Sequence, residues 1–484
     1  MMHRALIAAT WGLVTHNVNQ SSIKNHNGNG CTYLLRDVVT TADQMVEAYK
    51  DIVGAPGVSV SVSIDGNIVY CRGFGFADVE QGVKVTPQTK FRIASISKSF
   101  TSLLVGRMVD QGQLNLDADI KTYLPGFSPR TKEGNSVSIT MRQLLSHTSG
   151  IRHYHKSKDE NDDEYTGEML STKACDSALD SLAIFQNDAL LYRPGEDYLY
   201  STHGFTVVAA VLEAIMSKNY PHYSLFERPD RLKVPTGSGI GKMPEEVKSS
   251  SLFKELFKFL SLQNTCLDEP YNIVPFRARP YRRAKKNGRL ENSPCVNNSC
   301  KWSGGGLLST TPDLVKMASH LADIYMGRLC DLPQLAVVSR DTLVNCLWHP
   351  NRGTIQGLWL PGGLYGLGRS TTPIDKAKDS THSDRLYVGH TGGAIGFTSI
   401  LFMSLPIAAT STSDESDDPS SASHLPPICV AILANLENAK GIGQLAIHLT
   451  ELFTAVLLTP HIWPAAPIIT AEGPLSAPPI AIAA

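Results

Sequence analysis

A serine and a lysine three residues apart stand at the start of a segment with the hydrophobic spacing of a helix. Ser95 and Lys98 are the two ends of the tetrapeptide Ser-Ile-Ser-Lys. Residues three apart share one side of a helix, so the lysine amine can lie beside the serine hydroxyl. Serine is a nucleophile once a base takes its proton, and lysine serves as that base where burial lowers its pKa. The alternative is a chance match, in which Ser95 caps a helix and Lys98 points to solvent.

Two further motifs follow in an order that suits acyl transfer. The stretch from Tyr200 to Thr202 opens a predicted helix, and the stretch from His390 to Gly393 comes directly before an apolar strand. A tyrosine can move protons, and glycine lets the backbone pass close to a substrate. The alternatives are a core tyrosine before a buried helix and a histidine in a capped turn. The three motifs together favour a catalytic site.

With these motifs in order, the chain resembles the superfamily of serine β-lactamases and penicillin-binding proteins, whose pattern is Ser-x-x-Lys, Tyr-x-Asn and Lys/His-Thr-Gly. Three longer stretches, Phe91 to Lys98, Leu144 to Gly150 and Lys301 to Gly306, resemble its mitochondrial serine β-lactamase-like branch. The likeness extends from about Tyr49 to Phe453, interrupted by insertions. It implies an α/β (α+β) fold of the β-lactamase/transpeptidase type, in which helices flank an antiparallel sheet and an all-helical subdomain is added.

The same resemblance implies a role for each motif. Ser95 would attack a carbonyl, Lys98 would accept its proton, and Tyr200 would relay a proton to the leaving group, after which water releases the acyl group. Backbone N–H groups of Ser95 and Gly393 would form an oxyanion hole. The expected substrate-binding residues are Ser95, Thr202, His390, Thr391, Gly392 and Gly393.

Two positions depart from the family pattern. Thr202 stands where many relatives have asparagine, and because a hydroxyl replaces an amide only in part, the substrate preference is open. His390 replaces the common lysine, so we expect a positive charge that is lost near neutral pH and substrate-carboxylate binding that weakens as the pH rises. We find no motif for the deacylating glutamate of class A β-lactamases. Peptide or amide cleavage is therefore favoured over antibiotic turnover.

Histidines and cysteines raise a metal alternative. His147, His153 and His155 include a His-x-His pair, but the Asp-His pair expected of a metallo-hydrolase does not follow it. Among the nine cysteines the close pair Cys295 and Cys300 is spaced too widely for a usual zinc knuckle. We predict no metal, no other cofactor and free buried thiols, with His147 fixing a loop and His153 and His155 exposed.

Charge and hydropathy exclude two classes of partner. The chain has 44 lysines and arginines against 45 acidic residues, so it has no global field to hold nucleic acid or an anionic membrane. Its apolar runs are shorter than the roughly 20 residues of a spanning helix. We predict no nucleic-acid partner and no transmembrane span.

The elements that must position the motifs suggest a split domain. A helix capped by Thr41 and Asp43, a hairpin over Val58 to Tyr70 with an Asp65-Gly66 turn, and a helix ending at Gly112 are expected before residue 150. Strands are expected over Phe397 to Met403 and Ile428 to Ala434. The expected division is a targeting or disordered segment over 1–39, an α/β domain over 40–150 and 301–457, a helical subdomain over 151–300, a low-complexity insertion over 408–427 and an irregular tail over 458–484.

These expectations lead to two classes of function. The first is a serine peptidase or amidase that acts on a peptide or protein substrate. The mitochondrial resemblance further implies the intermembrane space and self-association into homo-oligomers or filaments, with a secreted or cytosolic location as the alternative. The second class is a scaffold that kept the fold without turnover and uses the basic stretch Arg277 to Lys286 and the acidic stretch Asp414 to Asp418 as contact surfaces. An esterase of the same fold is a third option.

Overall fold

The computed structural model describes most of the chain between residues 35 and 457. The described residues are 35–155, 167–219, 225–226, 248–351, 353–354, 360, 363–372, 385–407 and 425–457. The expected N-terminal segment before residue 35, most of the 408–427 insertion with its acidic stretch, and the expected tail lie outside them. The proposed division into domains stays a prediction.

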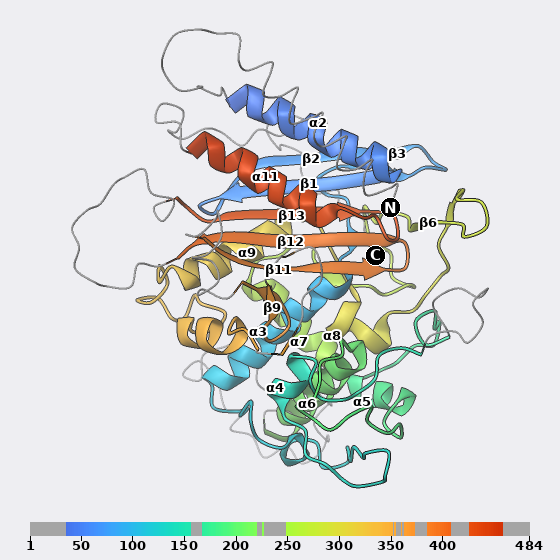
Figure 1. Ribbon diagram of the computed structural model, residues 1–484, viewed down its shortest axis with the longest axis vertical. Helices are drawn as coiled ribbons and strands as arrows, with labels where there is room; N and C mark the ends of the chain where they lie inside the picture. Colours follow the sequence, from blue (N-terminus) through green and yellow to red (C-terminus); the bar gives the residue numbers. More distant parts are fainter. Residues whose placement is uncertain are drawn as a thin grey trace, which may run out of the picture.

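A central antiparallel sheet combines strands from the early and the late parts of the sequence (Figure 1). Its strands are β1 (Gly57–Ile64), β2 (Asn67–Asp78), β3 (Val83–Lys84), β9 (Leu364–Tyr365), β10 (Ser370–Thr371), β11 (Arg385–Ala394), β12 (Phe397–Pro406) and β13 (Ile428–Ala434). Their order across the eight-stranded sheet is β3-β2-β1-β13-β12-β11-β10-β9. Strand β1 pairs with β13, with Val58 opposite Ala434, so the expected early hairpin and late strands share one sheet.

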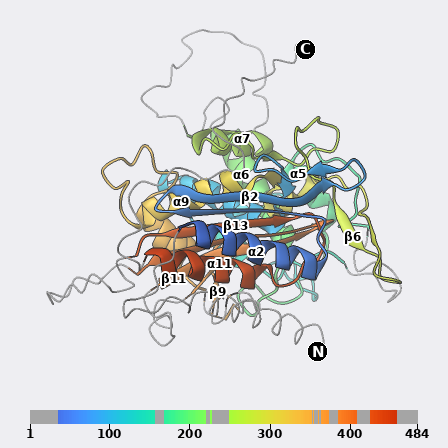
Figure 2. The same ribbon diagram turned by 90° about the horizontal axis from the view of Figure 1, so that it is seen from above.

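Helices cover both faces of this sheet. They are α2 (Leu35–Val53), α3 (Ser97–Asp110), α4 (Met141–Leu145), α5 (Ala178–Ser181), α6 (Thr202–Asn219), α7 (Ser249–Phe259), α8 (Trp302–Gly305), α9 (Thr311–Tyr325) and α11 (Ile442–Leu457). Figure 2 shows α2 and α11 on one face and α9 on the other. The predicted mixed fold with an antiparallel sheet is therefore confirmed. No helix in the described part of the chain is both long and apolar enough to cross a membrane.

Shorter elements complete the architecture. They are the 3-10 turns η1 (Ala94–Ile96), η2 (Ile120–Thr122), η3 (Leu182–Ile184) and η5 (Ser299–Lys301), the π-helical η6 (Thr342–Leu347), and the strands β4 (Phe91–Arg92), β5 (Cys266–Leu267), β6 (Tyr281–Arg283), β7 (Leu290–Asn292) and β8 (Leu307–Ser309). Strands β4, β8 and β5 form a small second sheet, and β6 pairs with β7 as a hairpin. The small sheet leads directly into η1 and so helps to place Ser95.

Strand β1 is buried on both of its faces. Its valines and Ile64 pack with α2 and α11. Its serines face α9 instead, where Ser61 donates a hydrogen bond of 2.8 Å to the Thr311 hydroxyl and the Ser63 hydroxyl lies 2.9 Å from that of Ser319. A buried hydroxyl costs free energy unless it is hydrogen-bonded, so these pairs explain how an alternating strand can lie between two helical layers.

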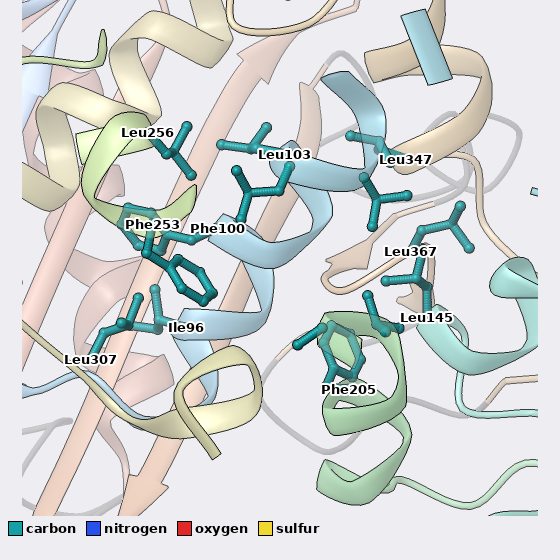
Figure 3. Close-up of a cluster of buried hydrophobic side chains, with 14 of the residues drawn as sticks. Ile96, Phe100, Leu103, Leu145, Phe205, Phe253, Leu256, Leu307, Leu347 and Leu367 are labelled. Atoms are coloured by element: carbon teal, nitrogen blue, oxygen red, sulfur yellow. The ribbon is translucent and has the colours of Figure 1, made fainter. Parts of the chain in front are cut away.

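Helix α3 connects the sheet to the helical part of the molecule. Nearly all of its side chains are buried, in contrast to the single apolar face of a surface helix. Phe100 and Leu103 of α3 pack near Phe253 of α7 (Figure 3). Phe205 of α6 also lies close to α3. The N-terminal end of α3 is therefore held by a dense core, which keeps the neighbouring Ser95 in a rigid setting.

Two expectations about local structure are wrong. Helix α2 begins at Leu35, so Thr41 and Asp43 lie inside it, and Asp43 accepts a hydrogen bond of 2.8 Å from Tyr70. Cys175 and Cys300 form a disulfide across 125 residues of sequence, although free thiols were expected. No sequence spacing signals such a pair, because the fold alone brings the two segments together.

The basic stretch Arg277 to Lys286, named above as a contact surface of the scaffold, carries less free charge than its sequence suggests. It contains β6, and its arginines are paired within the chain. The Arg279 guanidinium lies 3.0 Å from Glu80, and the Arg282 guanidinium lies 2.7 Å from Glu291. Because intramolecular acids neutralise these charges, the stretch offers less free positive charge to a partner than its sequence suggests.

Candidate active site

Ser95 and Lys98 lie side by side where the 3-10 turn η1 meets α3. Lys98 Nζ is 3.2 Å from Ser95 Oγ and donates a second hydrogen bond of 2.5 Å to the Gly304 carbonyl in α8. The lysine side chain has no exposed surface. Burial disfavours its charged form and lowers the Lys98 pKa to about 7. The hydroxyl is therefore next to an amine that is neutral just above neutral pH.

The backbone before Ser95 is strained and tightly packed. Ala94 has φ of 47°, a left-handed conformation that is unfavourable for a residue with a Cβ. Strand β11 presses against this turn, because a Cβ on Gly392 would lie 2.5 Å from the Ile93 carbonyl oxygen. Ser399 on β12 donates a hydrogen bond of 2.9 Å to the same carbonyl. The sheet thus holds the turn that presents Ser95.

Tyr200 lies directly before α6 and faces the same pair. Lys98 Nζ is 4.7 Å from the centroid of its ring. The phenol oxygen is buried and makes no hydrogen bond of ordinary length and angle within the part of the chain that the structure describes. Burial raises the Tyr200 pKa well above its ordinary value, although the neighbouring Ser95 hydroxyl opposes this. Tyr200 is therefore a neutral phenol that holds a proton near Ser95.

Two histidines hold the segment that carries Tyr200. His147 Nδ1 accepts a hydrogen bond of 3.1 Å from the Ser201 N–H, and His153 Nδ1 accepts one of 3.2 Å from the Thr202 N–H. The expectation that His147 fixes a loop is confirmed, and His155 is exposed as expected. His153 is not an exposed loop residue, because it is half-buried and lines the site.

His390 is a neutral residue in this structure. Its Nε2 lies 2.8 Å from the Tyr365 hydroxyl, and its Nδ1 lies 2.5 Å from the Thr391 carbonyl oxygen. Burial, followed by the positive charges of Lys98 and Arg369, lowers the His390 pKa to about 3. The expected loss of charge near neutral pH is therefore wrong, since the ring is already uncharged there.

A cavity of about 270 Å³ brings most of the predicted residues together. The predicted residues that line it are Ser95, Tyr200, Thr202, His390, Thr391 and Gly393. Lys98 and Gly392 do not line the cavity but lie next to residues that position it, Lys98 beside Ser95 and Gly392 against the Ile93 carbonyl. No group of His, Cys, Asp and Glu side chains among the described residues is arranged to hold a metal ion.

Lys301 also lines this cavity and has no predicted role. Its Nζ donates a hydrogen bond of 2.8 Å to the Met169 carbonyl and lies 5.4 Å from the centroid of the Tyr154 ring. Burial and the nearby Arg92 charge lower the Lys301 pKa to about 8. The sequence signal was the family-like stretch from Lys301 to Gly306, which gave no role to the lysine itself.

The fold and the site together define a β-lactamase-like serine hydrolase. Residues 42–452 match the family described as Beta-lactamase, and the chain belongs to this family. The serine beta-lactamase-like protein LACTB, mitochondrial, of Homo sapiens is 30% identical over 481 residues, which cover 87% of this chain and 80% of that protein. The predicted resemblance is confirmed.

Solved structures share the fold at lower sequence identity. The octameric penicillin-binding protein homologue from Pyrococcus abyssi superposes with a TM-score of 0.61 at 20% identity and covers 86% of this chain and 77% of its own. A D-stereospecific amidohydrolase from Streptomyces sp. superposes with a TM-score of 0.58 at 18% identity and covers 85% of this chain and 97% of its own. These likenesses confirm the β-lactamase and penicillin-binding protein type of fold.

Proposed function

We propose that this chain is a serine peptidase or amidase that forms an acyl-enzyme on Ser95. The observation that carries the proposal is the fully buried Lys98 amine, which lies 3.2 Å from the Ser95 hydroxyl. An exposed lysine is protonated at neutral pH and cannot accept a proton. A lysine with a pKa of about 7 is divided between the two forms at that pH, which is the condition for an efficient general base.

The reaction follows from these protonation states. Neutral Lys98 takes the Ser95 proton as Oγ attacks the substrate carbonyl, while the hydrogen bond to Gly304 keeps the amine in place. Neutral Tyr200 can then give a proton to the leaving amine and regain one from protonated Lys98. Water attacks the acyl group in the second half of the reaction. Backbone N–H groups of Ser95 and Gly393 would stabilise the oxyanion.

The edge of strand β11 next to the cavity is suited to bind an extended peptide. Strand β10 pairs with β11 at Val388 and Gly389, but no described strand pairs with this edge at Thr391 to Gly393. Thr391 and Gly393 line the cavity, and a Cβ built on Gly393 would contact nothing within 4 Å. A peptide can add to a free strand edge by main-chain hydrogen bonds. This geometry favours a peptide over a small ester.

Covalent labelling measured against pH tests the proposal. A fluorophosphonate probe is expected to add once to wild type, at Ser95, with a rate that rises through pH 7 and levels off above about pH 8. The sign follows from Lys98, whose lowered pKa leaves the amine protonated below pH 7 and free to accept a proton above it. Intact-mass spectrometry gives the adduct, and Ser95→Ala is the control. A folded wild-type protein that stays unlabelled would contradict the proposal and favour the scaffold.

Because Lys301 lines the cavity, we expect the protein to prefer peptides with an acidic residue. Among the described residues that line the cavity, Lys301 is the one that is mostly charged at pH 7, because burial holds the His153 and His390 pKa values at about 3. We expect Lys301→Met to lower kcat/KM about 10- to 100-fold for a peptide with an aspartate that reaches Lys301, the range for a hydrogen bond to a charged group. The matched asparagine peptide should change little.

The pH dependence provides an independent check on Lys301. Because its pKa is lowered to about 8, the wild-type preference for the aspartate peptide should fall as the pH rises through 8. Equal losses for the two peptides in Lys301→Met would show that the lysine has only a packing role.

The names of two similar proteins suggest where this protein is located and how it assembles. The human relative is named as mitochondrial, and the Pyrococcus homologue is octameric. We propose a mitochondrial protein, in the intermembrane space, that associates with copies of itself and can form filaments. Fractionation of mitochondria and light scattering of the purified chain would test the two parts separately.

A further inference from the structure

We propose that His147 is a positioning residue that orients Tyr200 for proton transfer to the leaving group. The inference rests on the proposed function and deepens it, because it concerns one step of that reaction. His147 does not line the cavity that contains Ser95 and Tyr200, so it has no direct contact with a substrate. Its effect must therefore pass through the tyrosine.

The contacts of His147 bracket Tyr200 on both sides. The His147 carbonyl accepts a hydrogen bond of 3.0 Å from the Leu199 N–H, and Nδ1 accepts one of 3.1 Å from the Ser201 N–H. The imidazole also lies against the phenol ring, with centroids 4.2 Å apart. One residue thus fixes the backbone before and after Tyr200 and one face of its ring.

The neighbouring chain reinforces the same placement. The Ser201 hydroxyl donates a hydrogen bond of 2.7 Å to the Arg152 carbonyl, and the Thr202 N–H donates to His153 Nδ1. Segment 147–153 therefore lies along segment 199–202 and determines where α6 begins. A tyrosine placed in this way has little freedom to move, which suits a group that must meet both an amine and a leaving group.

His147 itself is held at a free-energy cost. It has φ of 62°, in the left-handed region, and only 1% of its surface is exposed. Nδ1 accepts a hydrogen bond, so in the neutral ring the proton is on Nε2, and this atom has no partner among the described residues. A strained residue with an unpaired buried donor is unfavourable for stability, and such residues gather at functional sites.

Two substrates with one acyl group and different leaving groups test the inference. An anilide needs a proton on its leaving amine, whereas a p-nitrophenyl ester does not. We expect His147→Leu to lower kcat about 10- to 100-fold for the anilide and less than about threefold for the ester, with little change in KM. A residue that only supports the fold would lower both rates alike.

Conservative variants and a matched control sharpen the result. His147→Asn keeps an acceptor at the place of Nδ1 and should retain most anilide activity, whereas His147→Gln should not. His320 is the control, because its ring also accepts a backbone N–H, from Val337 at 3.3 Å, but it lies on α9. His320→Leu should leave the ratio of anilide to ester rates unchanged. If His147→Leu does not fold, the Asn and Gln variants still decide the question.

A double-mutant cycle with Tyr200→Phe completes the test. If His147 acts through the phenol, His147→Leu should change the anilide rate less than about threefold in the Tyr200→Phe background. Additive losses, or equal losses for anilide and ester, would overturn the inference. Failure of the proposed function gives a different result, namely that wild type is not acylated at Ser95 by either substrate.

Discussion

Replacing Lys98 by methionine is expected to lower the acylation rate of Ser95 by about 10²- to 10⁴-fold, the usual contribution of a general base. Methionine fills similar space but cannot accept the hydroxyl proton. The loss should occur in kcat, because Lys98 does not line the cavity and binds no substrate directly. Stopped-flow release of the leaving group, measured from pH 6 to 9, gives the rates. The rise in rate through pH 7 should also disappear.

The stability of the Lys98→Met protein separates a lost base from a lost fold. The folded pKa of Lys98 is about 7 and the ordinary value is 10.5, so between these values the unfolded chain binds more protons than the folded chain. The free energy of unfolding of wild type, relative to the variant, should therefore rise with pH from 7 towards 10.5. Melting temperatures at pH 7 and 9 measure this difference.

Lys316→Met is the matched control for Lys98. Lys316 lies on α9, and its amine donates to the Ser261 carbonyl at the exposed surface. Its replacement should leave the acylation rate and its pH profile unchanged. If Lys98→Met kept a wild-type rate and profile, Lys98 would not be the base and the mechanism would be wrong.

Replacing Glu213 by alanine is expected to have the largest effect on stability, a loss of roughly 3–5 kcal/mol. Glu213 lies on α6 with 2% of its surface exposed. Its carboxylate accepts hydrogen bonds from the Ala178 N–H at 2.9 Å and the Leu179 N–H at 3.2 Å at the start of α5, and from the Ser249 N–H at 2.7 Å at the start of α7. Without it, buried donors at two helix ends lose their acceptor.

Calorimetry of three variants tests this role of Glu213. Glu213→Gln keeps one acceptor oxygen but adds an N–H group that meets other donors, so its loss should be intermediate. Glu47→Ala, on the exposed side of α2, should change stability by less than about 0.5 kcal/mol. Equal melting temperatures for Glu213→Ala and Glu47→Ala would show that water replaces the carboxylate.

The two results bear on different parts of the molecule. Lys98 is the proposed base of a site between the sheet and the helices, whereas Glu213 on α6 bonds the starts of α5 and α7 and is not among the residues that line the cavity. A chain that lost activity in Lys98→Met with an intact fold would be an enzyme by the proposed mechanism. If Lys98→Met left the acylation rate unchanged while Glu213→Ala lost stability, the result would fit the scaffold instead.

Local patterns in the sequence were sufficient to predict much of the fold. The alternation in β1 and the Asp65-Gly66 turn predicted the hairpin, and both turn residues have the positive φ that a two-residue turn of this kind requires. Thr310 caps α9 in the same local way, with its hydroxyl accepting a hydrogen bond from the Asp313 N–H. These features depend on neighbours within a few residues, which is why the chain itself specifies them.

The proximity of Ser95 and Lys98 was likewise predicted from the sequence. A spacing of three residues at the start of a predicted helix puts both side chains on one side, and Lys98 Nζ lies 3.2 Å from Ser95 Oγ. The resemblance to a known family then predicted that Tyr200 and His390 lie near this pair. In the structure, Ser95, Tyr200 and His390 line one cavity. The position of the pair could therefore be predicted before its environment was known.

Only the tertiary structure decided the charges and the supports of the site. The Lys98, His390 and Lys301 pKa values depend on burial, which is produced by segments hundreds of residues apart. The Cys175–Cys300 disulfide and the helix-end contacts of Glu213 arise in the same way. Spacing along the chain fixes which groups are near one another locally, but desolvation depends on everything that packs around them, and no local pattern contains that information.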